Sequence, residues 1–168
     1  MNFIVAVSED YAIGKDGKML FDLKQDLKFF KEKTLNKVVV MGRKTYLSIP
    51  NAPLKDRINI VLTTDKTFCP QGVKVVYSYT ELFKELEKYN TEDVFLIGGA
   101  MLYNKLIDRC YKGYITKVHK IVEADTYIEN IENKPNWKEI NSSEKHYENG
   151  LSFEFKEFEN LNFKKTDF

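Results

Sequence analysis

A carboxylate borders the apolar side of the first helix that the sequence predicts. That helix runs from Leu23 to about Thr34, and at ~100° per residue Leu27 and Phe30 fall within about forty degrees of Leu23, which makes these three the expected buried stripe. Asp26 falls about sixty degrees to one side. An acid in the first turn is ordinarily a solvated residue favoured by the helix dipole. A carboxylate at the edge of the stripe can also face a ligand. The neighbouring segments therefore indicate whether Asp26 is a solvated acid or a ligand-binding one.

The connection before this helix is long and ends in apolar residues. Residues 12–23 follow the first expected strand, contain Gly14 and Gly17, and end with Met19-Leu20-Phe21 before the helix. Loops of this length in compact domains usually serve function, often as lids over a site. A simple surface excursion is the alternative, but it leaves the apolar end unexplained. We therefore expect residues 12–23 to form a lid.

Two further helices are expected to start at glycine-marked turns. The first turn reads Gly42-Arg43-Lys44-Thr45, and the second reads Gly98-Gly99-Ala100. Free backbone N–H groups at a helix start bind anions, and the two cations of the first turn add positive charge. Adjacent glycines let the backbone approach a pyrophosphate closely, although the G-x-G-x-x-G fingerprint is absent. Ordinary strand-to-helix turns are the alternative interpretation of both segments.

Short apolar, β-branched runs alternate with helical patterns over the first two thirds of the chain. Runs without polar alternation are typical of strands covered on both faces, and they span residues 3–7, 38–41, 58–62, 73–76 and 94–97. The predicted helices cover about residues 23–34, 43–49, 80–89 and 100–107. This alternation predicts a single α/β domain, doubly wound around a mostly parallel central sheet of about eight strands, with about four helices.

The last third of the chain predicts antiparallel strands. Residues 114–122 and 137–147 are extended, and Asn149-Gly150 before the alternating segment 151–156 is a strong hairpin signal. Phe158 breaks the alternation, so we expect a β-bulge near residues 156–158. We place the domain at residues 1–158 and expect the polar tail, 159–168, to fray.

Composition limits the classes of protein to which the chain can belong. Its 168 residues are 43% hydrophobic, with 26 basic and 25 acidic side chains and a net charge of +1. The apolar content is sufficient for one hydrophobic core. The near-zero net charge gives no electrostatic reason to expect nucleic acid or membrane partners. Cys69 and Cys110 lie far apart and near no histidine, so we expect no metal site and no disulfide. Without a leader or a stretch of membrane length, the chain is expected to be cytoplasmic.

Taken together, these segments resemble dihydrofolate reductase over about residues 1–158. The matching motifs are Ile13-Gly14 with Met19; Asp26-Leu27-x-x-Phe30; Val40-Met41-Gly42-Arg43-Lys44-Thr45-Tyr46-x-Ser48-Ile49; Pro53-Leu54-x-x-Arg57-Ile58-Asn59; Ile97-Gly98-Gly99-Ala100-x-x-Tyr103; and Ala124-Asp125-Thr126. Each motif is modest, but their joint order and spacing are highly specific. The resemblance implies NADPH-dependent reduction of 7,8-dihydrofolate to 5,6,7,8-tetrahydrofolate, with hydride passing to pterin C6 and a proton from water passing to N5. We expect a monomer.

The resemblance also implies the substrate site. Asp26 would accept hydrogen bonds from pterin N3 and the 2-amino group, a two-point carboxylate contact, while Thr116 steadies it. Arg57 would pair with the α-carboxylate of the glutamate tail, which suits its planar fork. The apolar wall would comprise Val5, Ala6, Leu27, Phe30, Ile49, Leu54 and Ile97. The residues expected to be catalytic are Asp26, Phe21, Tyr103 and Thr116.

The resemblance implies an NADPH site around the two glycine-marked turns. The pyrophosphate side would be cradled by Gly98, Gly99, Ala100 and Met101, with a cis peptide between the two glycines. A 2′-phosphate is bound by cationic and hydroxyl side chains, which Arg43, Lys44 and Thr64 supply. Asp65 is discordant, because its negative charge would repel the phosphate. The remaining expected cofactor contacts are Ala6, Ile13, Met19, Gly42, Thr45, Leu62, Thr63, Ile97, Leu102, Tyr103 and Thr126.

Three residues depart from the family pattern. Leu20-Phe21 replaces a common Pro-Trp pair, which removes an indole donor and frees the lid backbone, and Ala100 replaces the third glycine of the usual run. Two alternatives stay open. One is the pyrimidine reductase of riboflavin synthesis, whose substrate has no glutamate tail for Arg57 to bind. The other is a catalytically weak protein that binds folate or NADP as a structural component.

Overall fold

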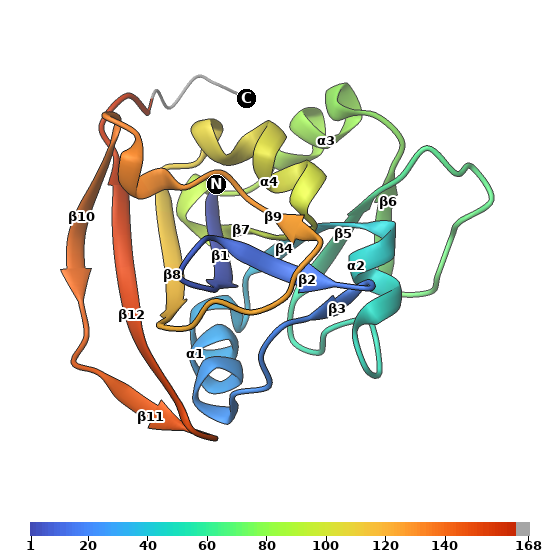
Figure 1. Ribbon diagram of the computed structural model, residues 1–168. Helices are drawn as coiled ribbons and strands as arrows, with labels where there is room; N and C mark the ends of the chain where they lie inside the picture. Colours follow the sequence, from blue (N-terminus) through green and yellow to red (C-terminus); the bar gives the residue numbers. More distant parts are fainter. Residues whose placement is uncertain (164–168) are drawn as a thin grey trace.

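One central sheet organises the chain in a computed structural model that describes residues 1–163 (Figure 1). Its strands lie in the order β10-β12-β8-β1-β7-β4-β5-β6, with β11 beside β12. The six strands from β8 to β6 in this order are parallel, whereas β12 is antiparallel to β8, β10 and β11. The strands are β1 (Asn2–Val7), β4 (Val38–Gly42), β5 (Ile58–Leu62), β6 (Val73–Val76), β7 (Val94–Gly98), β8 (Lys112–Val118), β10 (Trp137–Ser142), β11 (His146–Glu148) and β12 (Leu151–Asn160). The predicted mostly parallel sheet with an antiparallel end is confirmed.

Helices cover both faces of this sheet. They are α1 (Lys24–Thr34) and α2 (Arg43–Ser48) on one face, α3 (Tyr79–Leu86) and α4 (Ala100–Leu106) on the other, and the short 3-10 helices η1 (Thr91–Asp93), η2 (Ile107–Arg109) and η3 (Ile131–Asn133). Within β4, Val38 and Val40 pack on the α3–α4 side, whereas Val39 and Met41 pack with Tyr46 of α2. Both faces of the strand are therefore buried, which explains its continuous apolar sequence.

The C-terminal hairpin forms at the predicted turn. Asn149 and Gly150 have φ values of 52° and 72°, as a type I′ turn between paired strands requires. The strand expected over residues 137–147 is instead divided into β10 and β11. Ser143 lies between them and is fastened to β12, because its hydroxyl oxygen accepts a 3.0 Å bond from the Phe155 N–H.

A bulge is present opposite residues 157 and 158, near the expected place, but its extra residue lies on β10 and not on β12. β12 pairs without a register shift along β8 and continues to Asn160, and the irregularity lies on β10, between Glu139 and Asn141. Phe153 and Phe158 belong to clusters on opposite faces of the sheet. The break in alternation therefore marks a change of buried face along a regular strand. β12 ends beyond the boundary expected at residue 158, and residues 164–168 of the expected tail lie outside the described part of the chain.

The segment expected to be a lid loop forms part of a second sheet. β2 (Ala12–Lys15) pairs antiparallel with β3 (Lys18–Met19) and β9 (Thr126–Tyr127), and this small sheet lies in front of the central one in Figure 1. Gly14 is closely packed there, since a Cβ would lie 3.1 Å from the Lys18 carbonyl oxygen. The Asp16 N–H donates to Asp125 Oδ2 over 2.8 Å. The segment is thus ordered by a partner far along the chain.

Candidate active site

Asp26 and Thr116 form a hydrogen-bonded pair between α1 and β8. The Thr116 hydroxyl donates to Asp26 Oδ1 over 2.6 Å, and Thr116 is only 1% exposed. Burial raises the pKa of Asp26, the Thr116 bond to the ionised form acts in the opposite direction, and the charge of Glu148 adds to the rise. Among residues 1–163 no other group bonds to this carboxylate, so Oδ2 is free to accept hydrogen bonds from a ligand.

The buried side of α1 matches the predicted stripe only in part. Leu23 is the residue before the helix, and Leu27 is 49% exposed. The helix also contacts the sheet through Phe29, whose ring stacks on that of Phe155 with centroids 4.4 Å apart. Leu23 is buried, Phe30 is half-buried and Thr34 is fully buried, so the predicted stripe is wrong at Leu27 alone.

Most of the apolar residues expected to form the substrate wall are half-buried. They are Val5, Ala6, Phe30, Ile49, Leu54 and Ile97, whereas Leu27 is exposed. Ala6 is the ladder partner of Thr116 across β1 and β8, and Ile49, Leu54 and Ile97 pack against one cluster. Val5 and Ile97 follow the buried residues Ile4 and Leu96 on β1 and β7. The contact of the wall residues with substrate stays a prediction.

Arg57 is tied to the far end of α1. Its Nε donates to Thr34 Oγ1 over 3.3 Å, and the Thr34 hydroxyl donates to the Phe30 carbonyl over 2.8 Å. Another of its N–H groups donates to the Lys55 carbonyl. Burial lowers the pKa of Arg57, and the charge of Asp56 acts in the opposite direction. Because no carboxylate of the described residues forms an ion pair with Arg57, its charge is available to an anionic ligand.

The two glycine-marked turns meet at the ends of β4 and β7. Met41 is the ladder partner of Gly98, and a Cβ on Gly98 or Gly99 would lie 3.4 or 3.2 Å from Thr45 Oγ1. Gly98 has a φ of 131°, a conformation that favours glycine, and the Gly98–Gly99 peptide is cis, as the resemblance implies. The two glycines therefore let the Thr45 side chain of α2 pack closely against this turn. Adjacent glycine residues beside a helix start fit a pyrophosphate.

Tyr103 is a buried residue next to this turn. It is 3% exposed, and its hydroxyl donates to the Ile4 carbonyl over 2.7 Å. Its ring lies 3.5 Å from the position of a Cβ on Gly98. Burial raises the pKa of Tyr103, with smaller contributions from Cys110 and Asp26. The hydroxyl is thus occupied by the backbone, and the ring supports the glycine turn.

Arg43 and Asp65 are paired where a 2′-phosphate is expected. Arg43 Nη1 lies 3.4 Å from Asp65 Oδ2, and Asp65 accepts bonds from the Thr67 hydroxyl and N–H over 2.6 and 2.9 Å. The Thr67 bonds lower the pKa of Asp65. The discordant acid therefore stabilises a turn and holds Arg43 at the same time. The other expected residues of this region are half-buried (Thr45, Leu62, Thr63) or exposed (Lys44, Thr64).

The expected residues of the lid and its surroundings divide between surface and core. Met19 and Met101 are 69% and 78% exposed, and the half-buried residues are Ile13, Leu20, Ala100 and Thr126. Phe21 is 9% exposed and belongs to a cluster with Leu23, Val118 and Phe153. The apolar end of the lid thus contributes to a small core. A catalytic part for Phe21 stays a prediction.

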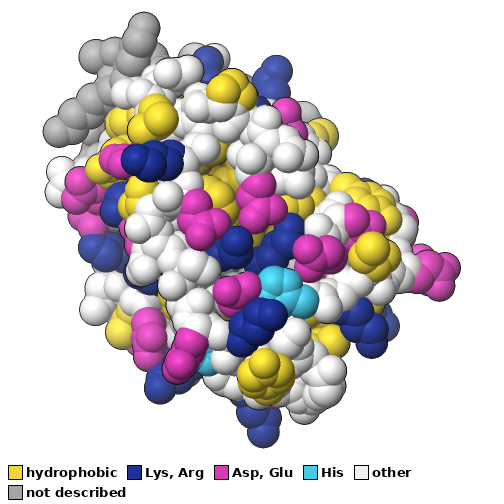
Figure 2. All heavy atoms as spheres, turned by 60° about the vertical axis from the view of Figure 1, so that its left-hand side comes forward, with side chains coloured by type: hydrophobic (Ala, Val, Ile, Leu, Met, Phe, Trp, Pro, Cys, Tyr) yellow, Lys and Arg dark blue, Asp and Glu magenta, His cyan; other side chains and the backbone are white. Residues whose placement is uncertain are grey.

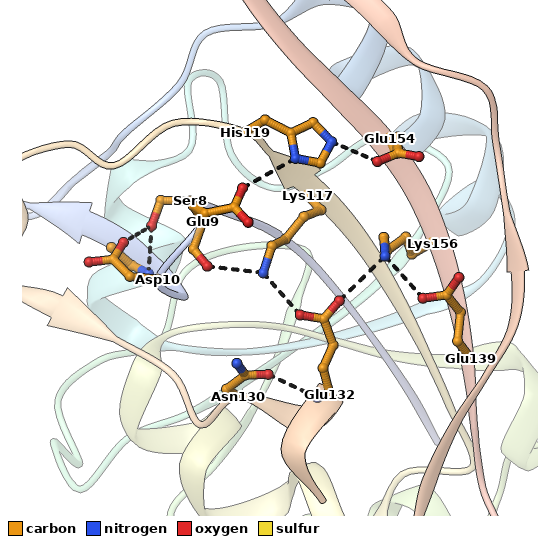
Figure 3. A network of polar contacts seen from close by, with 11 residues as sticks. Ser8, Glu9, Asp10, Lys117, His119, Asn130, Glu132, Glu139, Glu154 and Lys156 are labelled. Atoms are coloured by element: carbon orange, nitrogen blue, oxygen red, sulfur yellow. Dashed lines mark hydrogen bonds and ion pairs between the residues drawn. The ribbon is translucent and has the colours of Figure 1, made fainter.

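A polar network that the sequence did not reveal fastens the turn between β1 and β2. Lys117 of β8 is 4% exposed, and its Nζ donates to the Glu9 carbonyl and to Glu132 Oε2, both over 3.0 Å (Figure 3). His119 lies between the carboxylates of Glu9 and Glu154, at 3.2 and 2.6 Å. On the β10–β12 side of the molecule acidic and basic side chains lie intermingled (Figure 2). These partners are far apart along the chain, so no local pattern predicts them.

Within residues 1–163, no helix is long and apolar enough to cross a membrane. No group of three or more histidine, cysteine, aspartate or glutamate side chains in the same residues is arranged to hold a metal ion.

Known proteins match nearly the whole chain. The family described as dihydrofolate reductase matches residues 1–160. The dihydrofolate reductase of Bacillus subtilis is 35% identical, covering 99% of this chain and 98% of that protein. That of Drosophila melanogaster is 34% identical, with coverages of 92% and 94%. A solved structure of dihydrofolate reductase from Enterococcus faecalis, complexed with NADP(H) and RAB-propyl, has a TM-score of 0.84 at 31% identity and covers 95% of each chain. The chain therefore belongs to the dihydrofolate reductase family and is an NADPH-dependent oxidoreductase of folate metabolism.

Proposed function

We propose that this chain reduces 7,8-dihydrofolate to 5,6,7,8-tetrahydrofolate with the Asp26–Thr116 pair as the anchor of the pterin. The observation that carries the proposal is a carboxylate whose Oδ1 is held by a 2.6 Å bond while Oδ2 is free, among half-buried apolar residues. A pterin presents N3–H and its 2-amino group side by side, and a carboxylate of fixed orientation accepts from both. The membership of the family supports the same substrate.

The reaction needs a hydride at C6 and a proton at N5 of the pterin. NADPH, when bound, supplies the hydride from C4 of its nicotinamide. Asp26 holds the pyrimidine side of the pterin and stabilises the positive charge that the ring gains on protonation. Because a carboxylate bound to N3 lies away from N5, a water molecule donates the proton to N5. The apolar wall limits the access of other water to the reacting atoms.

Arg57 recognises the other end of the substrate. Its guanidinium is held against α1 by Thr34 and has no carboxylate partner within the described residues. A planar fork of this kind binds a carboxylate through two parallel hydrogen bonds. We therefore assign Arg57 to the α-carboxylate of the glutamate tail, with Leu27, Phe30 and Leu54 against the benzoyl ring between the two ends.

NADPH would lie along the two glycine-marked turns. Gly98 and Gly99 carry no side chain and pack against Thr45 near the start of α2, and adjacent glycines of this kind fit the close approach of a pyrophosphate. Arg43, Lys44 and Thr64 would bind the 2′-phosphate. Arg43 is already positioned by its ion pair, although Asp65 neutralises part of its charge.

The catalytic unit is proposed to be a monomer of residues 1–160 in the cytoplasm. One chain carries every group assigned above to substrate and cofactor, so the site needs no second copy. Strand β12 and the family match both extend to residue 160. Cys69 and Cys110 are both free thiols, which suits a reducing compartment.

The test is the loss of NADPH absorbance on mixing the purified chain with dihydrofolate. Turnover with equal amounts of NADPH and dihydrofolate consumed is expected. A chain that binds both ligands and turns over neither would be a folate-binding or NADP-binding protein without the activity. Turnover of a pyrimidine of riboflavin synthesis in place of dihydrofolate would reassign the substrate.

A further inference from the structure

The helix that carries Asp26 starts without a cap from its own segment. The residue before α1 is Leu23, whose side chain accepts no hydrogen bond. The first bond within the helix runs from the Leu27 N–H to the Leu23 carbonyl over 3.0 Å. The N–H groups of the residues between them therefore need acceptors from elsewhere in the molecule.

Glu148, at the end of β11, supplies two of these acceptors. Its Oε1 accepts from the Lys24 N–H over 2.8 Å, and its Oε2 accepts from the Gln25 N–H over 3.1 Å. A carboxylate at this position is also favoured by the helix dipole. The bonds from Gln25 and Lys24 lower the pKa of Glu148, so the group is ionised at neutral pH.

The residues beside it strengthen this contact between the β11–β12 turn and the start of α1. The Gln25 side chain donates to the Tyr147 carbonyl over 3.4 Å and lies 3.1 Å from His146 Nδ1. The Asn149 side chain donates to the Asp22 carbonyl over 3.1 Å. The hairpin therefore holds residues 22–25 through several side chains, of which Glu148 alone reaches the free N–H groups of the helix.

We propose that Glu148 is a positioning residue for dihydrofolate reduction, because it holds the first turn of α1 and thereby sets Asp26 against Thr116. The inference rests on the function proposed above for the Asp26 site. Asp26 is the next residue after the two whose N–H groups Glu148 binds. Greater mobility of this turn therefore displaces the Asp26 carboxylate directly. Even a small displacement weakens its 2.6 Å hydrogen bond to Thr116.

Glu148 also places a second negative charge near Asp26. The groups that face Asp26 from other elements are Thr116 of β8, Tyr103 of α4 and Glu148 of β11, and Lys24 of α1 itself lies against Glu148. Glu148 is the acid among them, and its charge acts to raise the pKa of Asp26. Loss of this charge lowers the pKa of Asp26, and entry of water through a loosened turn acts in the same direction.

The test compares Glu148→Gln with Glu144→Gln in the full chain. Glutamine keeps the shape of Glu148 but has one acceptor oxygen and no charge. Glu144 is exposed in the connection between β10 and β11, and its carboxylate bonds to no described residue, so its replacement removes the same charge without touching α1. Rates of NADPH oxidation by dihydrofolate are measured across pH. The rise or fall of the rate with pH that is lost in Asp26→Asn reports the titration of Asp26, and we call it the Asp26 limb.

We expect Glu148→Gln to lower kcat/KM for dihydrofolate about three- to tenfold at neutral pH and to leave the KM for NADPH unchanged. The Asp26 limb should move to lower pH, and this shift should shrink as salt is added. Glu148→Asp keeps the charge but shortens the reach, so its limb should stay nearer that of the wild type while kcat/KM still falls. Glu144→Gln should match the wild type throughout.

An Asp26 limb that stays in place in Glu148→Gln, or that moves equally in Glu144→Gln, overturns the proposal. Wild-type kcat/KM in Glu148→Asp and Glu148→Gln together overturns the positioning role. These failures are distinct from that of the proposed function, which would be seen as absence of turnover in the wild type and would remove the premise of this inference as well.

Discussion

Replacing Thr116 with valine keeps the shape of the side chain and removes the hydroxyl that donates to Asp26. The 2.6 Å distance lies in the range of charge-assisted O–H···O⁻ bonds, so the relevant magnitude is about 1.5–3 kcal/mol and not the ~1 kcal/mol of a neutral pair. We therefore expect the free energy of unfolding at pH 7 to fall by about 1.5–3 kcal/mol. For a domain of this size the melting temperature should fall by roughly 3–12 °C.

The pH dependence of this loss follows from the sign of the Thr116 contribution. Burial, the larger effect, raises the pKa of Asp26, whereas the Thr116 bond favours the ionised form and lowers it. The stabilisation by that bond is complete above the pKa of Asp26 and declines as pH falls through it. The difference between Thr116→Val and the wild type should therefore shrink towards that of a neutral hydrogen bond, about 0.5–1.5 kcal/mol, in acid.

Thermal and urea unfolding of wild type, Thr116→Val and Thr116→Ser at several pH values provide the measurement. Serine keeps the hydroxyl and loses only a methyl group, so its loss should be smaller and nearly independent of pH. Equal destabilisation of the two variants, or a Thr116→Val loss that is constant from acid to neutral pH, would show that the hydroxyl does not bond to an ionised Asp26.

Three further predictions concern the rest of the site and its support. Arg57→Ala should raise the KM for dihydrofolate about 10–100-fold with an unchanged KM for NADPH, and initial rates with a pterin that lacks the glutamate tail should not respond to it. Asp65→Asn should free Arg43 from its ion pair and raise the ratio of kcat/KM for NADPH over NADH by up to about fivefold; an unchanged ratio would contradict the assignment. Glu132→Gln should leave buried Lys117 without its carboxylate and lower the free energy of unfolding by about 1–3 kcal/mol at pH 7 in urea titrations. Burial raises the pKa of Glu132, but the opposing effect of the Lys117 and Lys156 ammonium groups is larger, so the pKa is lowered overall. The loss of stability should therefore vanish as pH falls through this lowered pKa.

The fold was predictable where the sequence pattern is local. Continuous apolar runs such as Val38 to Met41 identified the parallel strands, because a strand covered on both faces is mostly apolar along its length. The same logic failed at β12, where Phe153 and Phe158 lie in clusters on opposite faces. A regular strand that changes its buried face has the same sequence pattern as a bulged strand. The pairing of β2 with β9 was also missed, because it depends on a partner about a hundred residues away.

The site was predictable through the family resemblance more than through residue patterns. The helical wheel predicted a buried stripe of Leu23, Leu27 and Phe30, but Leu27 is 49% exposed, because an apolar residue of a surface helix need not be buried. The family resemblance implied that Thr116 steadies Asp26, and the structure shows a hydrogen bond between the two side chains. No pattern indicated Glu148 or Lys117, because their partners come from distant elements and a single charged residue carries no local signal.

Asp26 is proposed to anchor the pterin, and the other assignments of the site depend on this role. The direct measurement is kcat/KM for dihydrofolate in Asp26→Asn, with NADPH affinity as the control for folding. Asparagine keeps the shape but presents a donor to N3–H, and a site built for such bonds discriminates by about 10⁴-fold or more. A loss of that size with unchanged NADPH binding is the expected result. Near wild-type turnover at neutral pH would show that Asp26 is only a solvated acid at the start of a helix.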